Sequence, residues 1–269
     1  MKKFISIFLA ALILCTGFAA CSKDESVNEN SEASTVAPII RPVIKENREV
    51  EKIKAADGKV SYILDITLPK ITENVSEDVI NLIDYYYSEM RNEAIRSAQA
   101  NAENARNYMK NNSDGKTPWQ RTITFETVYS SEKYLSIEIT DHFTMLGGQT
   151  TPTVSATLFD LENGSALSLT EIAKVDEETL KETVVPLMIR KTVDKFYSDG
   201  MELDEDQQQA VADSFNPYSF CYSSRGITVY INKNLIDQSY SGTFCCELTF
   251  SDLRNVISRL DVNTSQTEK

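Results

Sequence analysis

Residues 59–90, KVSYILDITLPKITENVSEDVINLIDYYYSEM, decide the fold of this chain because the spacing of apolar side chains changes within them. In the first part apolar and polar residues alternate up to Pro69, as in a half-buried strand. From Val79 onward apolar residues recur every three or four positions, as in an amphipathic helix. Ser76 is placed to cap that helix, and the two acidic residues after it favour the positive end of the helix dipole. The stretch predicts a strand followed by a long helix.

The second half of this predicted helix, which ends near residues 111–115, differs from the first because its apolar stripe thins to alanine. Ala94, Ala98 and Ala105 occupy the stripe there. Alanine on a helix face lets a neighbouring element approach closely, but a helix that projects past its sheet would need no larger side chains either. We therefore expect either tight packing or a projecting end.

Downstream of the helix, short strand and helix patterns are joined by turns such as Glu162-Asn163-Gly164. The patterns predict strands at 122–128, 134–143, 153–161, 218–222, 226–231 and 243–250, and helices at 176–199, 204–212 and 251–260. Hairpin connections favour an α+β fold over a parallel βαβ fold. We expect an antiparallel sheet packed by the long N-terminal helix and by a second, mid-chain helix.

The first 20 residues have the layout of a secretory signal peptide, with two lysines before the uncharged run Phe4–Ala20. The tetrapeptide FAAC at 18–21 resembles a bacterial lipobox, although Phe18 replaces the usual leucine. It predicts a lipoprotein acylated at Cys21, for example with palmitate, and two or three acyl chains suffice for a stable anchor. The uncharged run is close to the roughly 20 residues that span a bilayer, so a retained signal anchor is the alternative.

Residues 21–50 are rich in polar residues and lack a sustained apolar period, so we expect a disordered tether with a reach of roughly 30 Å. Its start, SKDE at 22–25, resembles the acidic export tag of surface lipoproteins in Bacteroidota-type bacteria, or is an ordinary charged spacer. After it we expect α+β subdomains at 51–145 and 146–262 and a tail at 263–269. We expect the protein to lie in the cell envelope, anchored by lipid to a membrane and facing the extracytoplasmic side. The outer cell surface is one of the locations that fit this expectation.

The chain is acidic, with a formal net charge of −13. Removal of residues 1–20 removes two lysines and no acids, which leaves 25 basic against 40 acidic residues and a net charge of −15. Such a surface repels nucleic acid and attracts cationic partners. Membrane contact is expected through the lipid anchor alone, and the oligomeric state stays open.

Three cysteines remain after the signal peptide and the anchor, namely Cys221, Cys245 and Cys246. In an oxidising compartment Cys221 could bridge to either of the other two, and adjacent cysteines on a strand point to opposite faces. A domain of this size does not need disulfides, so we favour buried free thiols.

The order of elements and several turn residues resemble paired domains of unknown function found together in bacterial envelope proteins. The resemblance spans roughly 51–260 and is carried by residues 134–143, Gly147-Gly148, SATLFDLENG at 155–164, LSLTEI at 167–172, FCY at 220–222, GITVY at 226–230 and YSG at 240–242. Such domains form the ectodomain of lysozyme-sensing anti-sigma factors and lie beside polysaccharide deacetylase domains. The resemblance implies binding of a peptidoglycan fragment, or of a cationic protein such as lysozyme, more than catalysis.

This sequence departs from those domains at Gln149 and Thr150, where members often carry an Ala-His pair. It contains neither an anti-sigma segment nor a deacetylase domain. Signalling and deacetylation are therefore not carried over from the resemblance.

Motifs of known chemistry are missing from the sequence. His142 is the one histidine, and there is no Gly-x-Ser-x-Gly elbow, zinc-ligand spacing or nucleotide fingerprint. The acidic run 199–206 lacks the order of an EF-hand loop. We expect no enzyme activity, no metal and no cofactor. The alternatives are a glycan-acting enzyme with two carboxylates about 5–10 Å apart, and an interaction module of an envelope complex.

The best candidate for a binding face lies on the predicted strand 134–143. Tyr134, Ser136, Glu138 and His142 share one face of it, opposite an apolar face that contains Leu135, Ile137, Ile139 and Phe143. We expect the apolar face to be buried and the polar face to be open. With the adjacent Gly147-Gly148 loop, the polar face is the predicted site.

Overall fold

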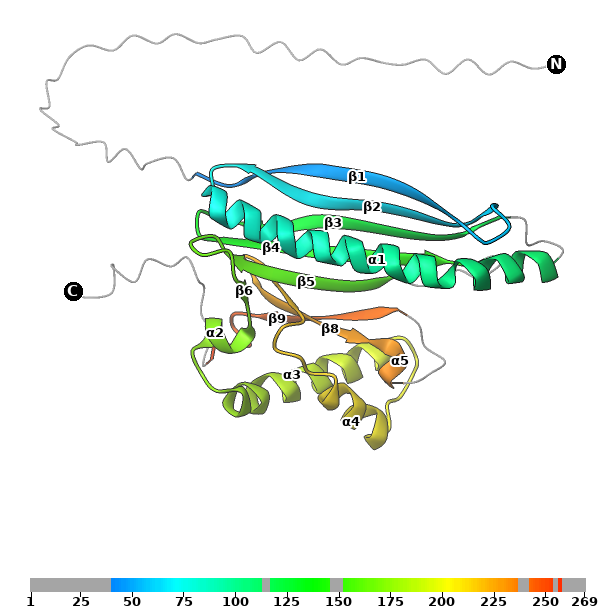
Figure 1. The fold of residues 1–269 in the computed structure, drawn as a ribbon. Coiled ribbons are helices and arrows are strands. Elements are labelled where there is room, and N and C mark those ends of the chain that lie inside the picture. Colours follow the sequence, from blue (N-terminus) through cyan, green and yellow to red (C-terminus); the bar gives the residue numbers. More distant parts are fainter. Residues whose placement is uncertain (1–39, 113–116, 146–151, 237–241, 254–255, 258–269) are drawn as a thin grey trace, which may run out of the picture. The chain divides into compact units, whose positions relative to one another are not determined.

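The computed structural model of the chain describes residues 40–112, 117–145, 152–236, 242–253 and 256–257, all within one compact unit. The strands in this part are β1 (Val43–Lys54), β2 (Val60–Glu73), β3 (Trp119–Ser130), β4 (Tyr134–Thr144), β5 (Thr153–Asp160), β6 (Ala166–Leu167), β7 (Phe220–Tyr222), β8 (Gly226–Asn232) and β9 (Thr243–Thr249). The helices are α1 (Glu77–Asn111), α2 (Leu169–Ala173), α3 (Glu177–Ser198), α4 (Glu205–Asp213) and α5 (Lys233–Ile236). Figure 1 shows their arrangement.

The strands form two sheets, a six-stranded sheet in the order β1-β2-β3-β4-β5-β6 and a three-stranded sheet in the order β7-β8-β9. Every neighbouring pair is antiparallel except β2 and β3, which are parallel and joined through α1. The α+β fold class is therefore confirmed, with one parallel pair that the hairpin pattern did not predict. A parallel pair requires a long crossover, and α1 provides it.

Helix α1 packs on one face of the six-stranded sheet and runs along its strands, as Figure 1 shows. It begins after Ser76, whose hydroxyl accepts a hydrogen bond from the Val79 N–H at 3.4 Å. Its buried stripe ends in Ala94, Ala98, Ala102 and Ala105, each at most 4% exposed. Alanine in this half therefore reflects tight packing on the sheet.

The second sheet lies between the first sheet and helices α3 and α4. Ile227, Val229 and Ile231 of β8 pack with Leu180, Val184 and Met188 of α3 in one hydrophobic core. The other face of β8 carries Tyr230, which packs with Ala156 of β5. In this part of the molecule the order of layers is thus α1, six-stranded sheet, three-stranded sheet, and α3 with α4.

The expected tether at 21–50 is wrong at its end, because Val43–Lys54 form β1 and pair along β2. The sequence pattern does not indicate this strand, because β1 lies at the edge of the sheet and its side chains are largely charged and exposed. Charged residues on an edge strand prevent pairing with other chains. The same composition is typical of disordered segments.

Pro69 does not end β2 as expected, since that strand continues to Glu73. Proline has no N–H to donate to a sheet ladder, so its nitrogen must face a side of the strand where no neighbouring strand accepts a hydrogen bond. The ladder between β2 and β3 covers Tyr62 to Ile66 only, and Pro69 lies beyond it, opposite Glu46 of β1. Its missing N–H therefore interrupts no bond to β3.

Two other expected boundaries differ from the structure. The predicted subdomain boundary at 145/146 falls between β4 and β5, which pair within one sheet. The predicted helix at 251–260 is not seen in the described residues 251–253 and 256–257, none of which is helical. None of the described helices is long and apolar enough to cross a membrane.

Candidate functional site

The polar face predicted as a site on β4 is covered by the second sheet. Ser136 is fully buried, accepts the Tyr222 N–H at 3.0 Å and lies 3.3 Å from the Cys221 Sγ. Glu138 accepts a 2.6 Å hydrogen bond from the Tyr230 hydroxyl. The expectation of an open polar face is thus corrected at these positions, because β4 is an inner strand with a layer on each side.

The other predicted site residues are either half-buried or lie outside the described residues. Tyr134 and His142 are half-buried, and burial raises the pKa of Tyr134. Gly147 and Gly148 lie outside the described residues, and so does Cys21. The structure therefore brings Ser136 and Glu138 to the contact between the sheets and leaves the glycine loop and the anchor untested.

The three cysteines of the domain are free thiols. Cys221 on β7 and Cys245 on β9 are separated by β8 and are offset along it, Cys221 opposite Thr228 and Cys245 opposite Tyr230. Two strand spacings alone are roughly 9–10 Å, beyond the reach of a disulfide. Cys246 points to the opposite face of β9 and lies in the core. The expectation of buried thiols holds for Cys221 and Cys246 but not for Cys245, whose side chain is exposed.

Burial sets the expected reactivity of these thiols. It raises the pKa of Cys221 to about 11 and that of Cys246 to about 12. Partial burial also raises the pKa of Cys245, but its side chain is exposed, so we expect iodoacetamide to modify Cys245 faster than the other two. Mass spectrometry of the labelled peptides checks this. After denaturation all three should react, whereas rapid labelling of native Cys221 would contradict the described packing.

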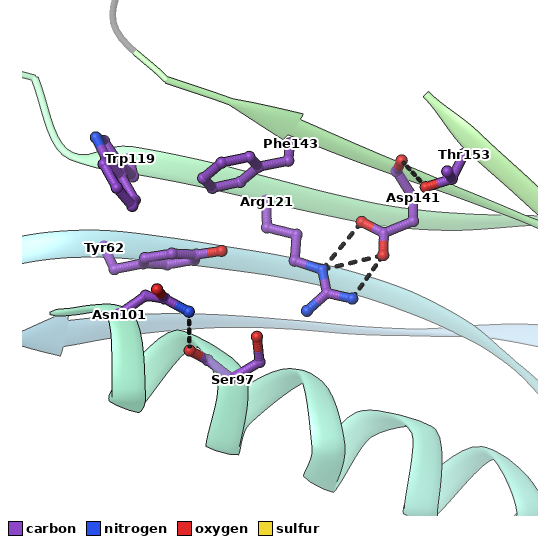
Figure 2. Close-up of a pocket in the computed structure, with 8 residues that line it drawn as sticks. All are labelled: Tyr62, Ser97, Asn101, Trp119, Arg121, Asp141, Phe143 and Thr153. Carbon is purple, nitrogen blue, oxygen red and sulfur yellow. Dashed lines mark hydrogen bonds and ion pairs between the residues drawn. The ribbon is translucent and has the colours of Figure 1, made fainter. Parts of the chain in front are cut away.

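A cavity of about 410 Å³ lies between α1 and the six-stranded sheet, and we call it the aromatic pocket. Its volume is in the range of small-molecule sites, roughly 300–1,000 Å³. Five elements supply its lining, which consists of Tyr62 from β2, Ser97 and Asn101 from α1, Trp119 and Arg121 from β3, Asp141 and Phe143 from β4, and Thr153 from β5. Figure 2 shows these side chains around the cavity.

The strand register explains why these residues meet. Tyr62 pairs with Trp119 across the parallel ladder, and Arg121 pairs with Phe143 across the antiparallel one. Side chains of paired residues lie on the same face of a sheet. Here that face is the one toward α1, which contributes Ser97 and Asn101 to the lining.

Three aromatic side chains form one wall of the pocket. The rings of Tyr62 and Phe143 are stacked, with centroids 6.0 Å apart and an interplanar angle of 21°. Trp119 meets Phe143 edge-on at 5.6 Å. Burial raises the pKa of Tyr62, so its hydroxyl stays protonated at neutral pH.

The polar end of the pocket is an ion pair between Arg121 and Asp141. The guanidinium Nε donates to the two carboxylate oxygens at 3.0 and 3.1 Å, and Nη2 donates at 2.6 Å. Both side chains are about one quarter exposed, at 23% and 26%. Hydrogen bonding to Asp141 raises the pKa of Arg121, so the guanidinium keeps its positive charge.

Sequence reasoning missed this pocket although one signal was present. Asp141 has the same strand parity as Leu135, Ile137 and Ile139, so it places a carboxylate on the apolar face of β4. Arg121 likewise shares a face with Ile123 and Phe125 of β3. A charge on a buried face needs a partner, and two such charges of opposite sign on neighbouring strands predict a pair.

Metal binding has no support in the described part of the chain, where no group of three or more histidine, cysteine or acidic side chains could hold an ion. The aromatic pocket contributes one carboxylate, that of Asp141, among its described lining residues. Its chemistry is that of stacking and hydrogen bonding.

No protein-family model and no curated protein matches the sequence. Solved structures that share its fold include two members of one family. A member of the DUF3298 family from Bacteroides fragilis has a TM-score of 0.58 at 12% identity, with 82% of this chain and 96% of that chain covered. A DUF3298 family protein from Pseudomonas aeruginosa has a TM-score of 0.53 at 14% identity, with 82% and 95% covered. DUF denotes a domain of unknown function, so the likeness gives the fold without an activity.

Proposed function

We propose that the protein is a lipid-anchored component of the bacterial cell envelope that binds a cell-wall component, without catalysis, at the aromatic pocket. The anchor and the extracytoplasmic location rest on the signal-peptide layout of residues 1–20 and on Cys21. The aromatic pocket is the single observation that carries the binding role.

The pocket combines the two kinds of contact that binding of a sugar-containing ligand requires. The C–H face of a sugar ring packs against aromatic rings, which the stacked Tyr62 and Phe143 provide. Its hydroxyl groups need directional partners, and Arg121 and Asp141 lie at the polar end. A concave apolar wall with a few fixed polar groups is the usual composition of a ligand site.

The arrangement of carboxylates favours binding over hydrolysis at this pocket. Glycoside hydrolases place two carboxyl groups about 5–10 Å apart across the scissile bond. Asp141 is the carboxylate among the described lining residues, and Arg121 holds it through two guanidinium nitrogens. Hydrolysis at this pocket would need a second carboxyl group, which the described lining residues do not supply.

Sedimentation with purified, insoluble peptidoglycan tests the proposal. We expect the protein to pellet with the wall material, and Phe143→Ala to weaken binding about tenfold because it removes one face of the aromatic wall. Tyr197→Ala is the matched control, since Tyr197 on α3 is 71% exposed and outside the pocket. Thermal unfolding should show that both variants are folded. Failure of the wild type to pellet would remove a cell-wall ligand.

A second candidate ligand is a cationic secreted protein such as lysozyme, which the net charge of −13 favours. Long-range attraction of this kind weakens as salt is added. Binding of a cationic lysozyme measured at rising ionic strength would show it, and no binding at low ionic strength would exclude this ligand.

Catalysis has one structural argument outside the aromatic pocket. Glu126 of β3 and Glu138 of β4 are directly opposite each other in the register, so two carboxylates share one face of the sheet. Incubation with muropeptides would reveal cleavage, and Glu138→Gln should abolish it.

An interaction module of an envelope complex would instead be recovered from membranes with a constant partner.

A further inference from the structure

We propose that the aromatic pocket recognises an uncharged sugar ring, and hence the glycan strand of the cell wall and not its charged peptide stem. The inference rests on the proposed function, because it names the ligand chemistry of the same pocket. Its basis is the electrostatic state of the pocket and the hydrogen-bonding groups that remain available in it.

The first observation is that the two charges of the pocket cancel each other. Arg121 and Asp141 are joined by three hydrogen bonds of 2.6 to 3.1 Å. A charged ligand group would have to compete with this internal partner for either side chain. An uncharged polar group can instead bond to the outer positions of the pair without breaking it.

The second observation is that the pair still offers a donor and an acceptor. Among the described residues no hydrogen bond involves the Nη1 of Arg121, and Figure 2 shows this nitrogen turned away from Asp141 toward the α1 side of the cavity. A carboxylate oxygen accepts about two bonds, and Oδ1 of Asp141 receives one here. Hydroxyl groups both donate and accept, so a ring that carries several of them satisfies both positions.

The third observation concerns the helix side of the pocket. Asn101 donates its Nδ2 to the backbone carbonyl of Ser97 at 2.9 Å, which holds the amide at the cavity. Its Oδ1 remains an acceptor for a ligand hydroxyl or amide. The aromatic wall, the ion pair and this amide therefore surround one space, as Figure 2 shows.

The test uses the full chain, chitotetraose as an uncharged N-acetylglucosamine probe, and a synthetic stem peptide as a charged probe. We expect calorimetry to detect chitotetraose and not the peptide. The affinity should change less than about twofold between 50 mM and 500 mM salt, because screening acts on charged groups. A steep loss of affinity with salt, or binding of the stem peptide in place of the sugar, would overturn the inference.

Substitutions separate the role of the pair from its effect on folding. Arg121→Lys should weaken chitotetraose binding about tenfold. The planar guanidinium of arginine can hold Asp141 and donate a further hydrogen bond to the sugar, whereas the lysine ammonium lacks this planar arrangement of donors. Asn101→Ala leaves the ion pair intact and should weaken binding severalfold, so it serves if the first variant unfolds. Unchanged affinity in folded variants would also overturn the inference.

The two proposals fail in different ways. If peptidoglycan sediments the protein but chitotetraose does not bind, the sugar inference fails and cell-wall binding stands. If neither binds, both fail.

Discussion

Phe159→Ala is expected to lower the free energy of unfolding by about 3–5 kcal/mol, because the substitution leaves a cavity in a packed core. Phe159 on β5 is 1% exposed. Its ring meets Tyr86 at 5.4 Å and Tyr87 at 5.9 Å, so it joins the N-terminal half of α1 to the sheet. Denaturant titration followed by circular dichroism would measure the loss. Tyr85→Ala is the control, since Tyr85 is 66% exposed and its removal should change stability by less than about 0.5 kcal/mol.

The same experiment tests whether the domain unfolds as a unit. Leu158 and Phe159 are neighbours on β5, but Leu158 lies in the core of α3 and the second sheet, whereas Phe159 lies in the core under α1. Because one strand belongs to both cores, we expect Leu158→Ala and Phe159→Ala each to shift one cooperative transition. Two separate transitions, each sensitive to one variant, would restore the division into subdomains near residue 145.

Gly226→Ala is expected to cost about 3 kcal/mol, at the upper end of overpacking effects. A Cβ atom at Gly226 would lie 2.0 Å from the Leu248 carbonyl oxygen and 2.7 Å from the Thr249 Cα. Both are backbone atoms of β9, so relief requires the strands of the small sheet to separate.

Gly200→Ala provides the contrast to Gly226→Ala. Gly200 has a φ of +78° but nothing within 4 Å of the added carbon, so its cost is backbone strain of about 1–2 kcal/mol. Thermal unfolding of the two variants should therefore show the larger loss at Gly226. Equal or reversed losses would contradict the described approach of β8 and β9.

The elements that could be predicted from sequence are those with strong local signals. The capped start of α1, its apolar stripe and the alternation in β2 and β4 all appear where expected. α4 also begins directly after its capping residue, Asp204. Such signals are local because capping and periodicity depend on neighbours within a few residues.

The parts that could not be predicted depend on pairing between distant segments. β1 is stabilised as a strand by its ladder with β2 and by ion pairs such as Arg91–Glu49, at 2.5 Å, which no local pattern encodes. The sequence around Glu138 does not indicate that Tyr230, from a different sheet, donates a hydrogen bond to it. The polar face of β4 is therefore predicted to be open although the structure covers it. The aromatic pocket depends on the register of four strands, and the signals for it in the sequence were the charges of Arg121 and Asp141 on otherwise apolar strand faces.

The most direct test of the central claim, that the aromatic pocket is the cell-wall binding site, uses the fluorescence of Trp119. The chain contains one tryptophan, and it lines the pocket. Titration with soluble peptidoglycan fragments should change its emission in a saturable way, with the same midpoint as binding measured by calorimetry. Binding in calorimetry without any change in Trp119 emission would place the ligand elsewhere and contradict the claim.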